Sequence, residues 1–309
     1  MNIIGRRRLW FAISLAVIIP GIVSIFFWGL RPGIDFAGGQ VMEVAGTQDQ
    51  QFLREALQGV GARDIIITTT GGDRLLARYR DAEGKDSTVT SNEVKAKLQE
   101  RNAQQTSFES IGPAVSRDIT RNAFVSVGLA SLVIVFFIAF AFRNTPPPVS
   151  PWSFGITAII ALLHDTVVII GVFSLLGHFA KVEIDSLFVT AVLTAIGFSV
   201  HDTIVVYDRI RENLKRSNEQ FEVVVNDSIV ETLARSLATS LTVVFTLLAL
   251  LIFGGETIRL FVLALLIGII SGTYSSIFNA APMLVAWHTF KQKRRTRKQA
   301  TSKQKPKKR

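Results

Sequence analysis

The sequence contains no cysteine among its 309 residues, which excludes a disulfide framework, a thiolate nucleophile and a cysteine-ligated zinc site. It also lacks the glycine-rich phosphate loop of ATPases, and no hydrophobic segment carries the Gly-x-Gly-Asp or Gly-x-Ser-Gly motif of intramembrane proteases. His164 and His201 lie in separate hydrophobic segments, a pattern typical of hydrogen-bonded core residues rather than of metal ligands. We therefore expect no enzymatic activity, no cofactor and no metal site.

Hydrophobic residues make up 49% of the chain and its mean hydropathy is +0.37, which is too apolar for an ordinary soluble domain. A helix needs about 20 predominantly apolar residues to cross the hydrocarbon core of a bilayer. Six stretches meet this requirement, so the sequence predicts an α-helical polytopic membrane protein with six transmembrane helices. The stretches cover residues 9–30, 123–142, 152–176, 186–207, 237–253 and 258–287.

The basic residues outside these stretches predict the orientation of the chain. They gather before the first stretch and after the second, fourth and sixth, which all lie on the same side of a six-span protein. They are Arg6, Arg7, Arg8, Arg143, Arg209, Arg211, Lys215, Arg216 and the basic residues of the C-terminal tail. Because short cytoplasmic loops are enriched in Lys and Arg, we expect both termini to be cytoplasmic.

The chain carries a formal net charge of +10, most of which comes from its C-terminal end. Residues 291–309 hold eleven of the 34 Lys and Arg residues and no acid. We expect a disordered basic tail over residues 289–309 that follows the positive-inside rule, and a contact with anionic lipid or ribosomal RNA is the alternative. No aromatic residue follows Phe290, so specific nucleic-acid recognition is not expected.

One long polar segment, residues 31–122, separates the first two spans and lies on the side opposite the termini. Its pattern predicts a small α+β domain with strands at 38–46, 62–70, 73–80 and 105–112 and helices at 49–61 and 91–102. We expect a turn at Gly71, Gly72 and Asp73, and Ser91 as the N-cap of the second helix. The order β-α-β-β-α-β matches a ferredoxin-like unit. The predicted parts are thus 1–30, the outer domain 31–122, a five-helix bundle 123–288 and the tail 289–309.

Ionisable side chains interrupt the hydrophobic stretches at three places. His164 and Asp165 lie in the third stretch, His201 and Asp202 in the fourth, and Arg235 at the mouth of the fifth. A charged residue at the centre of a spanning helix costs roughly 2.5–3.5 kcal/mol on insertion scales, so such residues usually face a bundle interior or a water-filled cavity. The His-Asp-Thr sequence shared by the two sites is either a local repeat or a coincidence.

Helical geometry places Asp202 on a stripe of small residues that lets another helix approach closely. At about 100° per residue, four residues fall on or beside this stripe: Ala191, Ala195, Ser199 and Asp202. His201 is turned away, on the side of Gly197. A suitable neighbour is the sixth span, in which small or polar residues recur at roughly four-residue spacing: Gly268, Gly272, Ser276 and Asn279.

An acid in such a seam is subject to two opposing effects. Desolvation favours its neutral form and a nearby Arg favours its charged form, so a balanced carboxyl can load and release a proton. A proton moving through roughly 100 mV releases about 2.3 kcal/mol, enough to shift a conformational equilibrium more than tenfold. Three roles remain open for Asp202: a proton relay, a static interhelical hydrogen bond or ion pair, and ion coordination. Asp165 is a second, weaker relay candidate.

Three segments together resemble the SecF branch of the SecD/SecF protein-export family, and the resemblance extends from residue 6 to residue 290. The first is RPGIDFAGG at residues 31–39, which contains Gly33, Asp35, Phe36, Gly38 and Gly39. The second is ESIGPAVSRDI at residues 109–119. The third, and the most specific, is HDTIVVYDRIREN at residues 201–213, which contains Asp208 and Arg209.

The resemblance implies an accessory subunit of the bacterial Sec protein translocase in the inner membrane. Members of the family are similar to the resistance-nodulation-division transporters, pair with SecD, and are thought to use the proton-motive force to help move secreted proteins outward. The implied partners are SecD, the SecYEG translocase, the translocating unfolded polypeptide and membrane lipids, with YajC as a further candidate. A proton-coupled small-molecule transporter of the same superfamily and a non-transporting assembly factor are the alternative functions.

The resemblance also implies site residues. The membrane carboxylate of the family maps onto Asp202, and a basic residue of the following span maps onto Arg235. His201 and Asp165, which the pattern of charges singles out, complete the predicted proton relay. The predicted helix-packing residues are Gly197, Gly268 and Gly272. In the resulting hypothesis, protonation of Asp202 weakens its attraction to Arg235 and lets the helices shift.

Overall fold

The computed structural model describes residues 1–70, 74–80 and 87–303, and the chain divides into two compact units. The larger unit comprises Met1–Arg31, Ser126–Val182 and Leu187–Arg309. The smaller unit comprises Pro32–Val125 and Glu183–Ser186. It therefore combines the polar segment after the first span with the short turn between the third and fourth spans.

The smaller unit is built on an antiparallel sheet of four strands within the described residues. They are β1 (Gly39–Ala45), β2 (Arg63–Thr70), β3 (Arg74–Arg80) and β4 (Gln104–Ile111), in the spatial order β2-β3-β1-β4. In the central pair, Met42 lies opposite Ala77 and Val44 opposite Leu75, and all four are buried. Because side chains alternate along a strand, these positions form one apolar face of the sheet.

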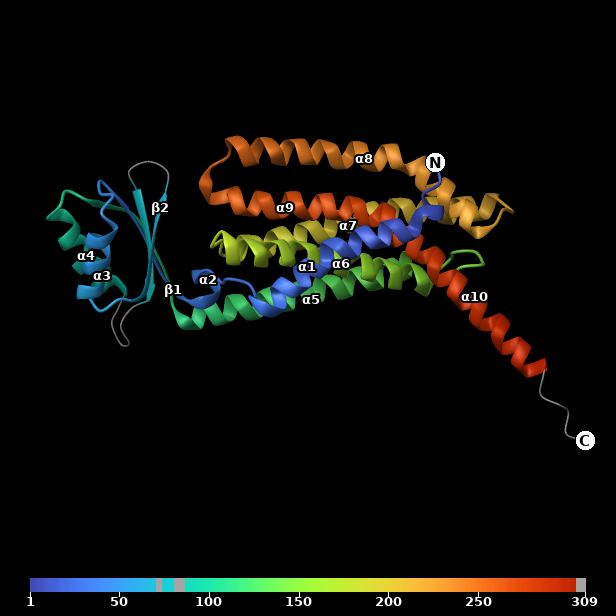
Figure 1. Cartoon of the computed structure of the whole chain (residues 1–309), viewed down its shortest axis with the longest axis horizontal. Coiled ribbons are helices and arrows are strands. Elements are labelled where there is room, and N and C mark those ends of the chain that lie inside the picture. The colour runs from blue at the N-terminus through green and yellow to red at the C-terminus, as the bar shows by residue number, and fades with distance from the viewer. Residues whose placement is uncertain (71–73, 81–86, 304–309) are drawn as a thin grey trace, which may run out of the picture. The chain divides into compact units, whose positions relative to one another are not determined.

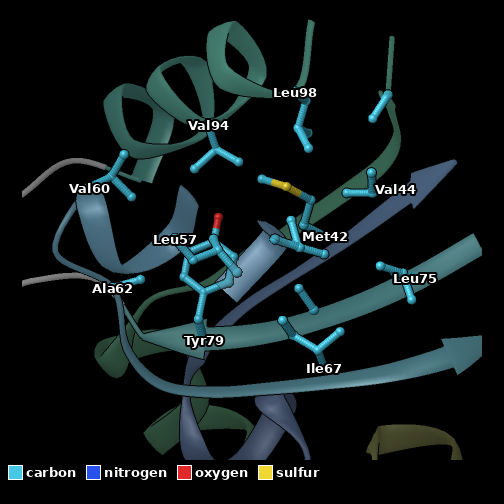
Figure 2. Close-up of a cluster of buried hydrophobic side chains, with 13 residues drawn as sticks. Met42, Val44, Leu57, Val60, Ala62, Ile67, Leu75, Tyr79, Val94 and Leu98 are labelled. Atoms are coloured by element: carbon cyan, nitrogen blue, oxygen red, sulfur yellow. The ribbon is translucent and has the colours of Figure 1, made fainter. Parts of the chain in front are cut away.

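Two helices, α3 (Gln50–Gly59) and α4 (Ser87–Gln99), bury their apolar residues in the same core. Leu53 and Leu57 of α3 and Val94 and Leu98 of α4 are almost fully buried. Figure 2 shows Val94 and Leu98 reaching down toward the strand residue Met42. The predicted elements of this segment are therefore present, and their shared core makes the unit compact.

The starts of the two helices differ in how well the sequence predicts them. Asp49 caps α3, since its side chain accepts a hydrogen bond from the backbone N–H of Phe52 at 3.0 Å. The prediction for Ser91 is wrong: α4 begins at Ser87, and Ser91 lies inside the helix, where its hydroxyl donates to Oε1 of Gln105 on β4 at 3.2 Å. The Ser91 hydroxyl, which the sequence pattern assigns to a helix cap, is thus hydrogen-bonded to a side chain of the sheet instead. The turn predicted at residues 71–73 lies outside the described residues.

Within the described residues, six helices are long and apolar enough to cross a membrane, as the sequence predicts. The first five are formed by η1 with α1 (Ile4–Arg6 and Arg7–Phe27), α5 (Pro113–Ala141), α6 (Pro151–Phe179), α7 (Ser186–Arg216) and α8 (Phe221–Phe253). The sixth joins α9 (Glu256–Ser275), the π-helical turn η2 (Ser276–Ala280) and the start of α10 (Ala281–Lys303). Figure 1 shows α8 and α9 running side by side.

Several helices extend beyond their hydrophobic stretches. α5 begins at Pro113, α7 continues to Arg216 and α8 begins at Phe221, although the sequence places the span boundaries near residues 123, 207 and 237. Hydropathy marks only the part of a helix that suits the hydrocarbon core, whereas polar residues with good helix propensity prolong the helix beyond it. The extension of α8 places Arg235, which the sequence puts at the mouth of a span, well inside the helix.

The N-terminus packs against the start of α8, as Figure 1 shows. Oδ1 of Asn226 accepts from the backbone N–H groups of Ile3 and Ile4 at 2.9 and 3.3 Å, and the amide of Asn226 donates to the carbonyl of Met1 at 3.0 Å. Asn213, near the end of α7, donates to Ser228 of α8 at 3.0 Å. The start of α1, the end of α7 and the start of α8 therefore lie at one end of the larger unit.

The C-terminal segment is helical further than the sequence predicts. α10 continues to Lys303, so the expectation of a disordered tail is wrong for residues 289–303, and residues 304–309 lie outside the described part of the chain. The physical reason is composition: residues 289–303 are rich in Lys, Arg and Gln, which favour helix, and contain no Pro.

Candidate functional site

Asp165, near the middle of α6, is 2% exposed and surrounded by hydrogen-bond donors. Its carboxylate accepts from the hydroxyls of Ser199 on α7 and of Ser271 and Ser275 on α9, at 2.5, 2.7 and 2.7 Å. Nδ1 of His164 lies 3.0 Å from Oδ1. Since an ionised carboxylate is an acceptor only, this set of donors fits an anion that ties three helices together.

Asp202, on α7, is equally buried at 2% exposed but has a much sparser environment. Among the described side chains, Ser240 of α8 is the hydroxyl that donates to it, at 3.2 Å to Oδ2. Nδ1 of His201 lies 3.8 Å from Oδ1, and the His201 side chain is 65% exposed, turned away from the helix seam as predicted. Asp202 can therefore gain or lose a proton without breaking several hydrogen bonds at once.

The helix α9 connects the surroundings of the two carboxylates. The hydroxyl of Thr273 donates to Ser240 at 2.7 Å, and the hydroxyls of Thr203 and Ser276 lie 2.9 Å apart. Ser276 is also the first residue of η2, and such π-helical turns often occur at functional sites. The buried interface of α6, α7, α8 and α9 thus contains hydroxyl groups around both acids, and α9 contributes to each group.

Two glycines of α9 let this helix approach α7 closely. A Cβ atom added at Gly268 would lie 2.4 Å from Cβ of Ala195, and one added at Gly272 would lie 2.7 Å from Cβ of Ser199. Gly197 differs, because it is exposed and an added Cβ would meet nothing within 4 Å. Gly197, predicted as a helix-packing residue, therefore contacts no other described helix of this chain, because two residues along a helix turn the direction by about 200°, away from Ala195.

We expect Gly272→Ala to lower the stability of the chain by about 1–3 kcal/mol, because overpacking a tight interface forces backbone or side-chain shifts. Gly197→Ala is a matched control, since it gives a spanning helix the same gain of up to about 1 kcal/mol in helix propensity without a clash. Thermal unfolding of the purified chain in detergent measures both. Equal midpoints for the two variants would contradict the close approach of α7 and α9.

Arg235 does not contact Asp202 in this structure. It is exposed, and no carboxylate of the described residues lies within ion-pair distance of it. The register of α8 against α7 places Ser240 rather than Arg235 opposite Asp202, and five residues separate the two along α8, a rise of roughly 7.5 Å. Arg235 instead lines a cavity of about 280 Å³ together with Asp208 and Glu231.

Charged residues at the end of α7 join it to the start of α8. Arg209 forms ion pairs with Glu231 of α8 and, at 2.6 Å, with Glu212. Asp208 is exposed and pairs with Arg211 at 2.7 Å. Exposed pairs of this kind contribute little stability individually. Arg209 pairs across to α8, Asp208 pairs within α7, and both residues line the polar cavity beside Arg235.

The segment 31–39 closes on the turn between α6 and α7, within the smaller unit. The N–H of Gly33 donates to the carbonyl of Ile184 at 2.8 Å, and Oδ2 of Asp35 accepts from the N–H of Ser186, the first residue of α7, at 2.7 Å. A Cβ at position 33 would lie 2.9 Å from the Ile184 oxygen, so only glycine permits this contact. Asp35 thereby caps the helix that carries Asp202.

The rest of this segment leads the chain into the sheet. Phe36 lies half-buried in the short helix α2 (Ile34–Ala37), and Gly38 and Gly39 follow it with φ of +70° and +131°. These values fall where residues other than glycine are strained. Arg78 of β3 forms an ion pair with Glu183, which attaches the same turn to the sheet as well.

The profile of the family described as "Protein export membrane protein SecD/SecF, C-terminal" matches residues 90–290 of the chain. The chain belongs to this SecD/SecF family. Two relatives, both named "Protein translocase subunit SecF", match it over nearly their whole length. That of Thermobaculum terrenum is 47% identical, over 93% of this chain and 94% of the relative. That of Anaerolinea thermophila is 40% identical, over 94% of each chain.

A solved structure supports the same SecD/SecF membership. The crystal structure of SecDF from Thermus thermophilus, described as a translocon-associated membrane protein, has a TM-score of 0.80 and 32% sequence identity to this chain. The match covers 94% of this chain but 39% of that much longer one. The resemblance noted from the three sequence segments is thus confirmed, and the chain is a multi-pass membrane protein.

Four residues of this candidate site were not predicted from the sequence: Ser240, Ser271, Thr273 and Ser275. The available signal was the density of hydroxyl residues in two otherwise apolar stretches, SLATSLTVV and SGTYSS. That signal is ambiguous, because many hydroxyls in spans bond only to their own helix, as Thr239 does to the carbonyl of Arg235 at 3.0 Å. Within the described residues, no group of three or more His, Asp or Glu side chains could hold a metal ion.

Proposed function

We propose that the chain is the SecF-type subunit of a bacterial Sec translocase and that, with a SecD-type partner in the inner membrane, it couples the proton-motive force to late steps of protein export. The names of its relatives support the translocase role. The match to 39% of the SecDF chain supports a partner equivalent to the remainder of that protein. The SecYEG translocase, the unfolded exported polypeptide and membrane lipids are further proposed partners, with YajC as a candidate.

The observation that carries this proposal is the environment of Asp202. It is a fully buried carboxyl in a spanning helix, it accepts from a single described hydroxyl, and that hydroxyl is itself linked to α9 through Thr273. Ionisable residues at such depth are expensive and usually serve ion or proton movement. A permanently charged structural acid would be expected to gather more donors, as Asp165 does.

We propose the following coupling step. Asp202 takes up a proton from the outer side, and its protonated carboxyl becomes a hydrogen-bond donor, which reverses or breaks its bond with Ser240. The contact of α7 with α8 and α9 changes as a result, and release of the proton toward the cytoplasm restores it. Arg235, which lines the polar cavity near Asp208, is proposed to approach Asp202 in another state of the cycle.

The proposed topology follows from the charges. Arg7, Arg209 and the basic residues of α10 belong to the ends of helices at or next to the termini, so both termini are proposed to be cytoplasmic. The smaller unit is then periplasmic. Its strand order β2-β3-β1-β4, with α3 and α4 packed into one core, supports a ferredoxin-like fold for this domain.

Asp35 is proposed to transmit movement between α7 and the periplasmic domain, because it caps the first turn of that helix. We expect Asp35→Ala to lower proton-driven export about fivefold, the equivalent of a lost cap of about 1 kcal/mol. Asp35→Asn should retain most activity, since its amide oxygen can still accept from Ser186. Asp118→Ala, an exposed acid of α5, is the control. Wild-type export by Asp35→Ala would contradict this role.

Proton-driven translocation into membrane vesicles tests the proposed function directly. Vesicles that contain the translocase and a SecD-type partner, with or without this chain, are given an exported precursor after the ATP-driven motor has been inhibited. We expect an imposed pH gradient to move the precursor only when the chain is present. Equal translocation without the chain, at unchanged levels of the other subunits, would refute the proposal.

A further inference from the structure

A stripe of buried hydroxyl residues lies on α8. It begins at Ser240, beside Asp202 of α7, and runs toward the start of α8. Its members are Ser228, Thr232, Ser236 and Ser240, spaced four residues apart and all buried. Residues four apart lie on the same face of a helix. One face of α8 is therefore polar for three turns in a segment that otherwise consists mainly of apolar residues.

This face contacts α7 at both of its ends. Ser240 donates to Asp202, and at the other end Ser228 accepts from Asn213 of α7 at 3.0 Å. Asp202 and Asn213 are eleven residues apart on α7, and their partners Ser240 and Ser228 are twelve apart on α8 in the opposite order. The two helices are therefore antiparallel and keep nearly the same register between these contacts. Ser236 consequently lies one turn from Ser240, opposite the turn of α7 that follows Asp202.

Ser236 is the member of the stripe without a hydrogen-bond partner. Its side chain is buried, with the residue 2% exposed, and its hydroxyl contacts no donor or acceptor of the described residues. Thr232, by contrast, donates to the carbonyls of Ser228 and Ile229 at 2.9 and 3.2 Å. A buried hydroxyl left unpaired costs free energy, and an ordered water molecule is its usual partner.

The stripe borders a polar cavity at Thr232. Thr232 lines the cavity of about 280 Å³ whose wall also includes the acids Asp208, Glu212 and Glu231. Successive hydroxyls of the stripe are roughly 6 Å apart along the helix, about twice the length of one O–H···O bond. One water molecule between neighbouring hydroxyls would therefore complete a hydrogen-bonded path from Asp202 to the polar cavity at the end of α7 and near the start of α8.

We propose that this hydroxyl stripe, with a water molecule at Ser236, is the route by which the proton of Asp202 leaves toward the cytoplasm. Ser236 is a positioning residue in this route, since it orders water rather than carrying the charge. From the stripe the proton passes through the polar cavity beside Thr232 to the cytoplasmic water. The inference rests on the proposed function of Asp202, and it adds the exit path and its direction.

The absence of cysteine from the chain allows a direct test of the water path in membranes. Ser236→Cys and Thr232→Cys should react with the membrane-impermeant reagent sulfonatoethyl methanethiosulfonate from the cytoplasmic side and not from the outer side. Thr239→Cys is the matched control. It lies on the outward face of the same helix, away from the proposed water path, and should be unreactive. Labelling is measured by the mass of the full chain, in membranes that contain its partner. The route would be overturned if the Ser236→Cys thiol reacted with the reagent no faster than the Thr239→Cys thiol, or reacted only from the outer side.

Export assays separate this route from the function on which it depends. We expect Ser236→Val, which fills the water site, to lower proton-driven export by roughly tenfold or more, and Ser236→Thr to retain it. If Asp202→Asn is inactive but Ser236→Val is fully active, the route is wrong and the proposed function stands. If Asp202→Asn itself is fully active, the proposed function fails. If the Ser236→Val chain does not assemble, the labelling of Ser236→Cys and Thr232→Cys from the cytoplasmic side decides whether the route is right.

Discussion

Asp202→Asn should abolish export driven by a pH gradient while leaving the amount of assembled complex unchanged. Asn has nearly the shape of Asp and can still accept from Ser240, so the seam of α7, α8 and α9 is preserved, but it cannot bind or release a proton. A proton crossing roughly 100 mV supplies about 2.3 kcal/mol, and the variant loses all of this coupling. The gradient-dependent part of export should therefore fall to background.

The measurement compares the initial rate of precursor translocation in vesicles with and without an imposed pH gradient. Asp227→Asn is the control, because Asp227 is an exposed acid of α8 that is changed in the same way. Quantifying the chain and its partner in each membrane separates coupling from assembly. If the Asp202→Asn complex is present at wild-type levels and still exports with the gradient, Asp202 is a structural acid and the coupling proposal fails.

The second large effect is expected at Asp165, where substitution should lower the stability of the chain rather than its coupling to protons. Asp165→Ala removes the acceptor of three hydroxyls from α7 and α9, and each interhelical hydrogen bond in a membrane contributes about 0.6 kcal/mol on average. We therefore expect the chain to lose about 2 kcal/mol of stability, and the amount of assembled complex to fall. Asp165→Asn should lie between this variant and wild type, because its amide oxygen still accepts.

Unfolding of the purified variants in mixed detergent micelles measures this difference, with Asp202→Asn as the reference for a buried acid that makes fewer hydrogen bonds. The sequence predicts Asp165 as a relay residue, whereas its donors support an anchoring role. A stable Asp165→Ala chain that nonetheless loses proton-driven export would restore the relay role. A stable and fully active variant would contradict both roles.

Much of the architecture could be predicted because hydrophobic length and period are local properties. The six spans follow from runs of about 20 apolar residues, and the four strands follow from alternating patterns such as that around Met42 and Val44. Asp202 could be found for a related reason: a charge in an apolar stretch is costly, so its presence is informative even in a single sequence.

What could not be predicted depends on how helices meet. The partner of Asp202 was expected to be Arg235, but the register of α7 against α8 places Ser240 there instead, and only tertiary packing fixes that register. The three hydroxyl donors around Asp165 come from α7 and α9, two helices that are distant from it in sequence. Gly197 and Gly268 look equivalent as glycines of apolar stretches, and only the rotation of each helix shows that one is packed and the other exposed.

The protonation state of Asp202 during the working cycle is the most direct test of this account. Infrared difference spectra of the assembled complex, recorded as a pH gradient is imposed, resolve the carbonyl band of a protonated carboxyl. The account predicts such a band that appears and disappears with the gradient in wild type, is absent in Asp202→Asn, and persists in Asp227→Asn. An identical spectrum with and without the gradient, or a band unaffected by Asp202→Asn, would contradict it.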